Sequence, residues 1–176
     1  DYGIGVLNIS VGGNPVGSVK HDPVARAVEL AWQHGIVVVC AAGNEGEFGR
    51  GSILSPGNDP FVITVGATDT RQTANVTDDA VATYSSQGPT LYDEIAKPDL
   101  VAPGNKIVSC GNTTSTLYRN YPSNRLTLSS GKTSYRYLVL SGTSMATPVV
   151  SGTVALMLQA NPSLTPNAIK AILAYT

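Results

Sequence analysis

A serine and its neighbours have the residue types and spacing that acyl-transfer chemistry needs. Ser144 follows Gly142 and Thr143 and opens a long apolar segment that predicts a helix over residues 144–160. The first turn of a helix has N–H groups without partners and a positive potential, and both stabilise an oxyanion formed beside the serine. Ser144 is therefore a candidate nucleophile. The alternative is that Thr143 or Ser144 only caps the helix.

Asn44 is a second candidate. It stands between Gly43 and Glu45, directly after the apolar run Ile36–Cys40. Because parallel-sheet proteins place ligand-binding groups at the carboxyl ends of strands, this position could aim the amide into a site. The alternative is an asparagine that adopts the left-handed conformation in a turn.

A serine nucleophile also needs a base, and the base needs a carboxylate to orient it. The chain has two histidines: His21 lies in a polar turn, and His34 ends a predicted helix before Gly35. Neither stands in a pattern that suits a general base. No histidine follows Ser144, although the order of residues in an α/β-hydrolase would require one.

The segments that must position these residues predict an α/β fold with three layers and a mostly parallel sheet. Apolar, β-branched runs predict four buried strands, at Val6–Ser10, Ile36–Cys40, Val62–Val65 and Ile107–Ser109. Helices are expected over Pro23–His34, with Asp22 as cap, and over the tail that follows Thr165 and Pro166. Residues 110–137 are expected to form a loop or hairpin insertion, with strands at Arg125–Ser129 and Ser134–Leu140.

Composition argues against several kinds of partner. The 176 residues carry a net charge of −1 without a run of Lys or Arg, so binding of nucleic acid or of an anionic membrane has no electrostatic basis. An apolar run of about 18 residues, as a transmembrane helix needs, is absent from the sequence. Cys40 and Cys110 are too few for a disulfide framework, and we expect Cys40 to be buried in a strand and Cys110 to lie in a polar loop.

Five motifs occur in one order: Leu7–Gly13, Ala41–Gly46, Tyr84–Thr90, Lys97–Gly104 and Gly142–Pro148. Together they resemble the subtilisin-like serine proteases, the subtilase family, from residue 6 to about residue 174. The resemblance implies that residues 1–176 are the C-terminal, serine-bearing part of a subtilisin-like catalytic domain. The family's catalytic Asp and His belong to an N-terminal portion that this sequence lacks, and we expect that portion to have been removed or to reside in another chain.

The resemblance also implies roles for single residues. Ser144 would be the nucleophile, and the Asn44 amide and the Ser144 N–H would form the oxyanion hole. Pro148 has no N–H and would leave the Ser144 carbonyl free. Leu54 stands where many relatives have glycine, so we expect a shallower pocket. The positions implied for substrate binding are Ser10, Val11, Gly12, Ala41, Ala42, Gly43, Glu45 and Leu54.

A metal, partners and a location follow from the resemblance as further expectations. Asp99 matches a position that binds a weakly held cation in some relatives, which implies a structural Ca²⁺; the alternative is that Asp99 caps a turn. The expected partners are a protein or peptide substrate and a complementary half of the same protease that carries Asp and His. Secretion is implied, with an intracellular location as the alternative.

Two other functions are considered. The chain could be a non-catalytic subtilase fragment that acts as a scaffold or peptide-binding module. A dinucleotide-binding domain has less support, because no Gly-x-Gly-x-x-Gly follows a predicted strand.

Overall fold

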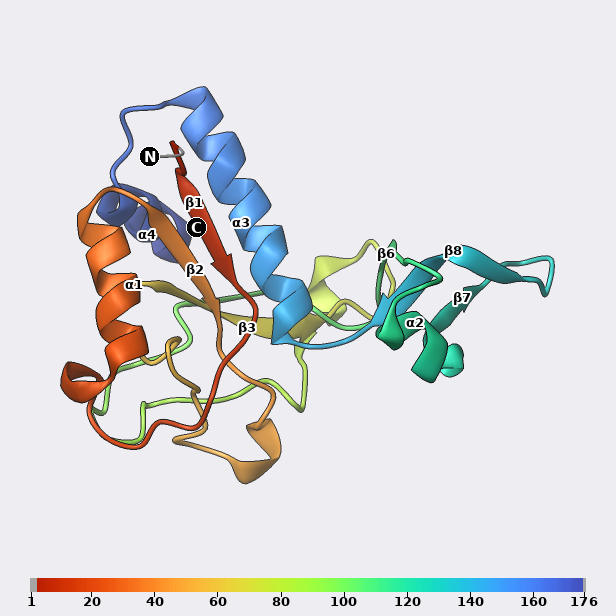
Figure 1. The fold of residues 1–176 in the computed structure, drawn as a ribbon, viewed down its shortest axis with the longest axis horizontal. Coiled ribbons are helices and arrows are strands. Elements are labelled where there is room, and N and C mark those ends of the chain that lie inside the picture. The colour runs from red at the N-terminus through yellow and green to blue at the C-terminus, as the bar shows by residue number, and fades with distance from the viewer. Residues whose placement is uncertain (1–2, 176) are drawn as a thin grey trace.

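The computed structural model describes residues 3–175 and shows a mixed α/β fold with a parallel sheet between helices (Figure 1). Strands β1 (Val6–Ile9), β2 (Val37–Ala41) and β3 (Ile63–Asp69) lie side by side and run parallel. Strand β5 (Leu100–Pro103) is parallel to β3, and the short β4 (Ala80–Val81) pairs antiparallel with the end of β3. The predicted α/β class is confirmed.

Helices cover both faces of this sheet. Helices α1 (Pro23–Gln33) and α4 (Pro166–Tyr175) lie together on one face, and α3 (Thr143–Ala160) lies on the other (Figure 1). Trp32 Nε1 of α1 donates to Asn167 Oδ1 of α4 at 2.9 Å. Because it is covered from both sides, every residue of β2 is buried, which explains its unbroken apolar run. Short 3₁₀ turns lie at Val19–His21, Gly46–Phe48, Val76–Asp78 and Pro122–Asn124.

Local signals set the ends of α1. Asp22 Oδ1 accepts from the N–H groups of Val24 at 2.8 Å and Ala25 at 3.2 Å, so it is the predicted cap. Gly35, with a φ of 86°, takes the left-handed conformation just beyond the helix. The predicted helix over Pro23–His34 is thus confirmed to within one residue.

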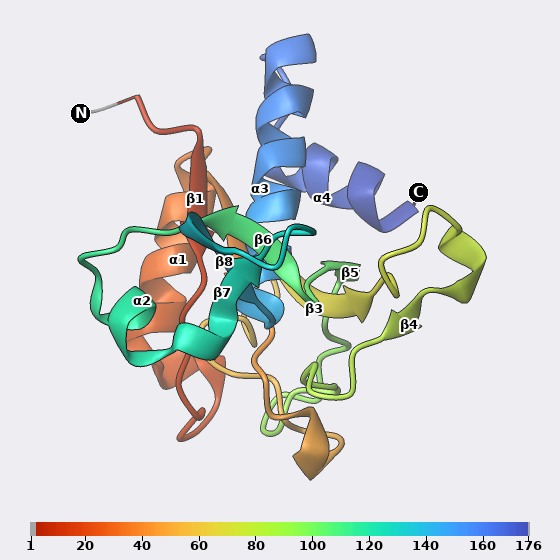
Figure 2. The same cartoon turned by 90° about the vertical axis from the view of Figure 1, so that its right-hand side faces the viewer.

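The fourth predicted strand was assigned to the wrong sheet. Strand β6 (Ile107–Cys110) is not part of the parallel sheet but pairs antiparallel with β8 (Thr133–Leu140), whose other edge holds β7 (Arg125–Thr127). The fourth parallel strand is β5, which the sequence does not reveal because only Ala102 of its four residues is buried. Helix α2 (Thr116–Asn120) lies between β6 and β7 and was not expected either. This second sheet projects sideways from the rest of the molecule in Figure 1 and lies in front of it in Figure 2.

The two cysteines are free and lie in different surroundings. Cys40 is buried in β2, and the loss of solvent raises the pKa of its thiol to about 12, so it stays protonated and unreactive. Cys110 is exposed at the end of β6 rather than in a loop. Within residues 3–175, no helix is long and apolar enough to cross a membrane.

Candidate active site

A cleft of about 280 Å³ lies where the carboxyl ends of β1 and β2 meet the first turn of α3. It brings together most of the residues that the sequence picked out, from four separate segments. The lining residues are Ser10, Val11, Gly12, Ala41, Gly43, Asn44, Glu45, Leu54, Thr143 and Ser144. Ala42 is not among them: it is fully buried, and its carbonyl accepts from the Leu54 N–H at 2.9 Å, so it holds Leu54 from behind.

Ser144 and Ser10 are joined by two reciprocal hydrogen bonds. The Ser144 hydroxyl donates to the Ser10 carbonyl, and the Ser10 hydroxyl donates to the Ser144 carbonyl, each at 3.0 Å. The second bond exists because Pro148 lies one turn further along α3 and has no N–H to occupy that carbonyl. Ser10 therefore fixes the first turn of α3 against the end of β1.

Thr143 fixes the orientation of the Asn44 amide. Asn44 Oδ1 accepts from the Thr143 N–H at 2.9 Å and from the Thr143 hydroxyl at 3.1 Å. Thr143 is itself fully buried and accepts from the Gly43 N–H at 3.2 Å. Because both donors face Oδ1, the amide nitrogen must point the other way. No local sequence pattern predicts this role of Thr143.

Two N–H donors are left over at the cleft. Among the described residues, neither Asn44 Nδ2 nor the Ser144 N–H has a hydrogen-bond acceptor. Both groups belong to residues that line the cleft beside the Ser144 hydroxyl. An oxygen that gains negative charge next to that hydroxyl would meet two fixed donors, which is the arrangement of an oxyanion hole.

Leu54 closes one side of the cleft. A Cβ on Gly43 would meet Leu54 Cγ at 2.6 Å, and a Cβ on Gly12 would meet Leu54 Cβ at 3.0 Å. The Leu54 side chain therefore fills the space between Gly12 and Gly43, and neither glycine can be replaced by a larger residue without a clash. Leu54 and Glu45 also line a neighbouring hollow of about 300 Å³, so they form the partition between the two cavities.

Neither histidine contacts the serine. His34 follows the end of α1, and its Nδ1 lies 2.8 Å from the Leu30 carbonyl. His21 lies in the 3₁₀ turn Val19–His21 that precedes α1. The hydroxyl of Ser144 is bonded to a carbonyl instead of a base.

Residues 1–176 match the Subtilase family throughout. The chain belongs to the subtilase family. It is 44% identical over 175 residues to serine protease AprX of Bacillus subtilis (strain 168), which covers 98% of this chain and 38% of AprX. It is 35% identical to subtilisin DY of Bacillus licheniformis, over 99% of this chain and 50% of that protein.

Solved structures agree with the subtilase fold. A cold-adapted subtilisin-like serine proteinase matches 97% of this chain with a TM-score of 0.64 and 31% identity, and sphericase matches 97% with a TM-score of 0.69 and 28% identity. In each case the chain covers 47% of the other protein. It thus spans half or less of the length of these relatives.

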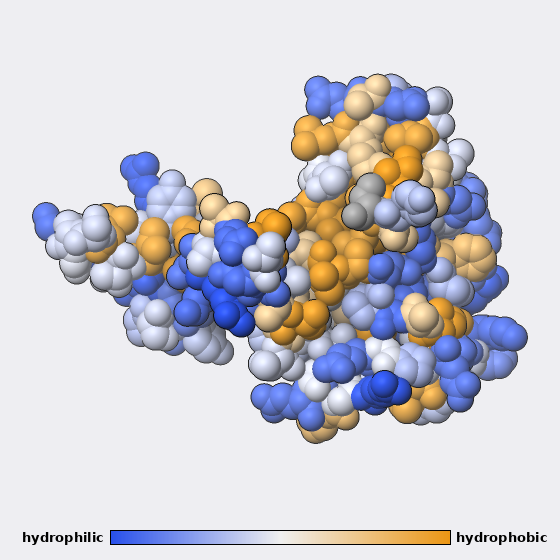
Figure 3. All heavy atoms as spheres, turned by 180° about the vertical axis from the view of Figure 1, so that it is seen from behind, coloured by the Kyte–Doolittle hydropathy of each residue, from blue (hydrophilic) through white to orange (hydrophobic). Residues whose placement is uncertain are grey.

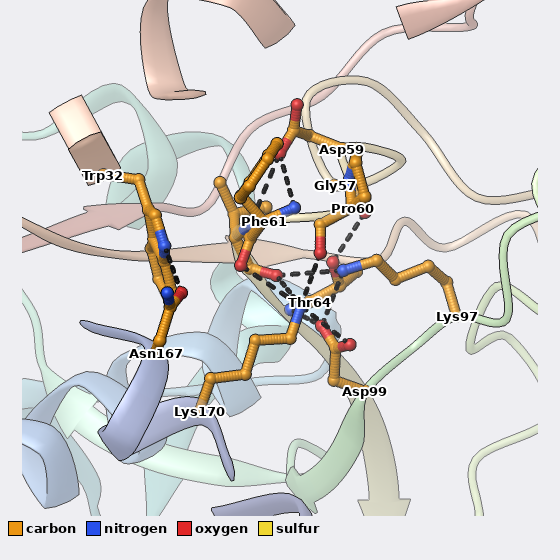
Figure 4. Close-up of polar contacts among 11 residues, drawn as sticks. Trp32, Gly57, Asp59, Pro60, Phe61, Thr64, Lys97, Asp99, Asn167 and Lys170 are labelled. Atoms are coloured by element: carbon orange, nitrogen blue, oxygen red, sulfur yellow. Dashed lines mark hydrogen bonds and ion pairs between the residues drawn. The ribbon is translucent and has the colours of Figure 1, made fainter. Parts of the chain in front are cut away.

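Subtilases generally bind calcium, and Asp99 is the position in this chain at which a cation is expected. Asp99 Oδ2 lies 2.7 Å from Lys97 Nζ, and Asp99 Oδ1 lies 3.1 Å from Lys170 Nζ (Figure 4). Both ammonium groups also donate to the Val62 carbonyl, each at 2.9 Å, and Lys170 reaches the carbonyls of Pro60 and Phe61.

This cluster does not fit a metal ion. The oxygens that could ligate a cation already bind two ammonium groups, whose positive charge would repel the ion. Asp99 Oδ2 also accepts from the Thr64 N–H at 2.7 Å, so the carboxylate has a structural role. Nor do residues 3–175 contain a group of three or more His, Cys, Asp or Glu side chains that could hold a metal. The sequence did not point to Lys170, which is 71 residues from Asp99 in the chain.

Proposed function

We propose that this chain is the serine-bearing part of a serine endopeptidase that hydrolyses peptide bonds. The observation that carries the proposal is the orientation of the Asn44 amide, whose nitrogen points away from Thr143 and has no acceptor among the described residues. A turn asparagine would not need such an arrangement beside a helix N-terminus and a serine. Ser144 is the nucleophile, and Asn44 Nδ2 with the Ser144 N–H is the oxyanion hole.

The reaction begins when the Ser144 hydroxyl leaves the Ser10 carbonyl and gives its proton to a histidine. Its oxygen bonds to the carbonyl carbon of the substrate, and the resulting oxyanion accepts from Asn44 and Ser144. The histidine then passes the proton to the leaving amine as the C–N bond breaks, and water repeats the sequence to release the acyl group. The segment Ser10–Gly12, in which Val11 and Gly12 are exposed, continues edge strand β1 and would pair with the backbone of an extended substrate.

The histidine and its aspartate come from polypeptide other than the described residues. We call this chain together with that Asp- and His-bearing polypeptide the assembled protease. Two surfaces of the chain support such a partner. Strand β1 is paired on one edge only within the described sheet. An apolar hollow of about 480 Å³ also opens between β5, α3 and the end of α4 (Figure 3); it is lined by Val101, Pro103, Val149 and Leu173 among others.

The alternative is a non-catalytic scaffold or peptide-binding module. It would use the same strand edge at Ser10–Gly12 but would have no need of the two donors. Hydrolysis of casein by the assembled protease, with Ser144→Ala as the control, separates the two. Loss of hydrolysis in the variant supports the endopeptidase, whereas no turnover in either protein supports the scaffold. Turnover that survives the substitution would show that Ser144 is not the nucleophile.

Replacing Leu54 by glycine is expected to change the preferred residue before the cut. The Leu54 side chain separates the cleft from the neighbouring hollow, so Leu54→Gly joins them into one deep pocket. We expect kcat/KM for substrates with Phe before the cut to rise relative to Ala by roughly 10-fold or more, since each extra buried methylene contributes about 1–3 kcal/mol. Assays of two peptides that differ only in Phe or Ala before the cut measure this ratio of kcat/KM values. An unchanged ratio would show that Leu54 does not set the depth of the pocket.

We also propose that the assembled protease is secreted. A relative from Thermus, 34% identical over 97% of this chain, is named an extracellular serine proteinase. Its substrates would be proteins or peptides. A structural Ca²⁺, if the assembled protease holds one, would bind away from the Asp99 cluster, because ammonium groups fill that position.

A further inference from the structure

The chain has a strongly uneven distribution of charge that its net value of −1 conceals. All 12 acidic residues lie outside residues 105–141, and five of the 11 Lys and Arg residues lie inside them. We call residues 105–141 the basic arm; it contains α2, β6, β7 and β8. The rest of the chain has six basic residues against its 12 acidic ones.

The basic arm is a small unit that stands away from the rest of the chain (Figure 1). It has its own buried residues, Tyr118 and Leu138, and the Tyr118 hydroxyl donates to the Ser134 carbonyl at 3.1 Å. Arg125 lies 4.3 Å from the centre of the Tyr118 ring and donates to the Tyr118 carbonyl at 2.9 Å, so this arginine holds the unit together.

Three of the other four cations of the basic arm are free to bind a ligand; the fourth, Lys106, interacts with Asp69. Arg119, Lys132 and Arg136 are exposed, and every ion pair among the described residues lies outside the arm. Lys132 and Arg136 line a hollow of about 500 Å³ together with Leu128, Thr133 and Ser134. The surface of the arm is also partly apolar, since Leu128 is 45% and Tyr121 is 55% exposed.

The base of the basic arm is fastened to the catalytic serine. Strand β8 leads through Ser141 and Gly142 directly to Ser144. The Gly142 N–H donates to the Gly104 carbonyl and the Lys106 N–H donates to the Ser141 hydroxyl, each at 2.9 Å, so the two ends of the arm are tied together there. A polypeptide that binds the arm is therefore anchored to the same segment of the chain that leads to Ser144.

We propose that the basic arm is a second binding surface for the substrate and takes an acidic stretch of polypeptide that flanks the bond to be cut. The inference rests on the proposed endopeptidase for the identity of the ligand. Positive side chains with no carboxylate near them select acidic segments, and the apolar Leu128 and Tyr121 suit the side chains between the acidic ones. A long polyanion such as nucleic acid is less suited, because the acidic excess of the rest of the chain would repel it beyond the arm.

Binding can be measured without cleavage, on this chain with a fluorescent peptide that contains a run of glutamates. A peptide with glutamine in their place is the neutral control. Fluorescence anisotropy is expected to show binding of the acidic peptide at low salt and weaker binding at physiological salt. Lys132→Gln/Arg136→Gln is expected to weaken binding of the acidic peptide by about tenfold. The matched variant Lys20→Gln/Arg71→Gln, which removes two exposed cations from the rest of the chain, is expected to leave binding within about twofold.

Three results would overturn the proposal. The two double variants could bind the acidic peptide equally well, or the chain could bind a single-stranded oligonucleotide of the same charge more tightly than the peptide. The chain could also associate with itself through the arm in a salt-sensitive way, which would leave the arm occupied. Circular dichroism checks that each variant is folded. A second variant replaces residues 111–136 by Asn-Gly, which joins the paired residues Cys110 and Tyr137 by a two-residue hairpin turn. It should also lose binding of the acidic peptide, and retention would count against the proposal.

The binding surface on the arm and the proposed endopeptidase can fail separately. If the assembled protease hydrolyses no peptide but the arm variants lose binding, the surface stands and the endopeptidase fails. If hydrolysis occurs, kcat/KM for a substrate with an acidic flank should exceed that for its glutamine counterpart, and the arm variants should lose this advantage. Hydrolysis with no such advantage would contradict the role of the arm in substrate binding.

Discussion

Replacement of Asn44 by leucine is expected to lower kcat of the assembled protease by about 10²–10³, the size measured for loss of the corresponding asparagine in a subtilisin. KM is expected to change little, because the amide nitrogen contacts the oxygen only once it carries negative charge. Thr143→Val is the matched control. It keeps the Thr143 N–H bond to Asn44 Oδ1 but removes the hydroxyl bond, so we expect a smaller loss of kcat. Initial rates with a chromogenic peptide measure both parameters.

A rise in KM at constant kcat would contradict this role and leave Asn44 as a binding or turn residue. Equal losses in the two variants would mean that the Thr143 hydroxyl, rather than the amide nitrogen, carries the effect. The two variants separate two roles: Asn44 Nδ2 donates to the oxyanion, and the Thr143 hydroxyl helps to orient the amide.

Replacement of Asp99 by asparagine is expected to destabilise the chain by about 2–4 kcal/mol. The change leaves the ammonium groups of Lys97 and Lys170 close together without their shared carboxylate, although the amide can still accept from the Thr64 N–H. Breaking a fully buried ion pair costs about 3–5 kcal/mol, and the 13% exposure of the Asp99 side chain reduces this somewhat. The pair Arg26–Glu29 supplies the control. The Glu29 side chain is 14% exposed, about as much as that of Asp99, but its partner Arg26 is 54% exposed and stays solvated when the carboxylate is lost, so Glu29→Gln should cost no more than about 1 kcal/mol.

The cost of Asp99→Asn is also expected to depend on pH. Burial lowers the pKa of Lys97 to about 8, and the nearby Asp99 limits this fall while Lys170 adds to it. The unfolded chain, with an ordinary lysine pKa of 10.5, therefore binds more protons above pH 8, and this lysine makes the free energy of unfolding rise with pH between about 8 and 10.5. Without Asp99 the pKa of Lys97 falls further, so the rise begins at lower pH. The difference between wild type and variant should shrink from pH 7 to pH 10 in urea titrations; a constant difference would show that the loss is not electrostatic.

The helices and the central strands could be predicted because each is specified by nearby residues. Asp22, Pro23 and Gly35 mark the ends of α1, and the unbroken apolar run of β2 follows from burial on both faces. Ser144 and Asn44 were predicted from the set of motifs that resembles the subtilases, since each motif alone also suits a cap or a turn. The structure places the two residues in one cleft.

The rest depended on contacts between distant segments. The bonds that orient Asn44 and Ser144 join residues 99 and 134 positions apart, and no local pattern reports them. Only one residue of β5 is buried, so this strand lacks the apolar pattern of the other parallel strands. The apolar run Ile107–Ser109 was predicted as the fourth parallel strand instead. The motif that contains Asp99 implied a cation there. Its partner Lys170 lies on α4, far outside the motif, so the motif could not reveal that an ammonium group takes that position.

A fluorophosphonate probe, followed by the intact mass of the product, shows whether Ser144 is a nucleophile whose base lies outside the described residues. We expect no labelling of this chain alone, one label on Ser144 in the assembled protease, and none in its Ser144→Ala variant. Labelling of the isolated chain at Ser144 would show that the base lies within it. Labelling at another serine, or none in the assembled protease, would contradict the assignment of the nucleophile.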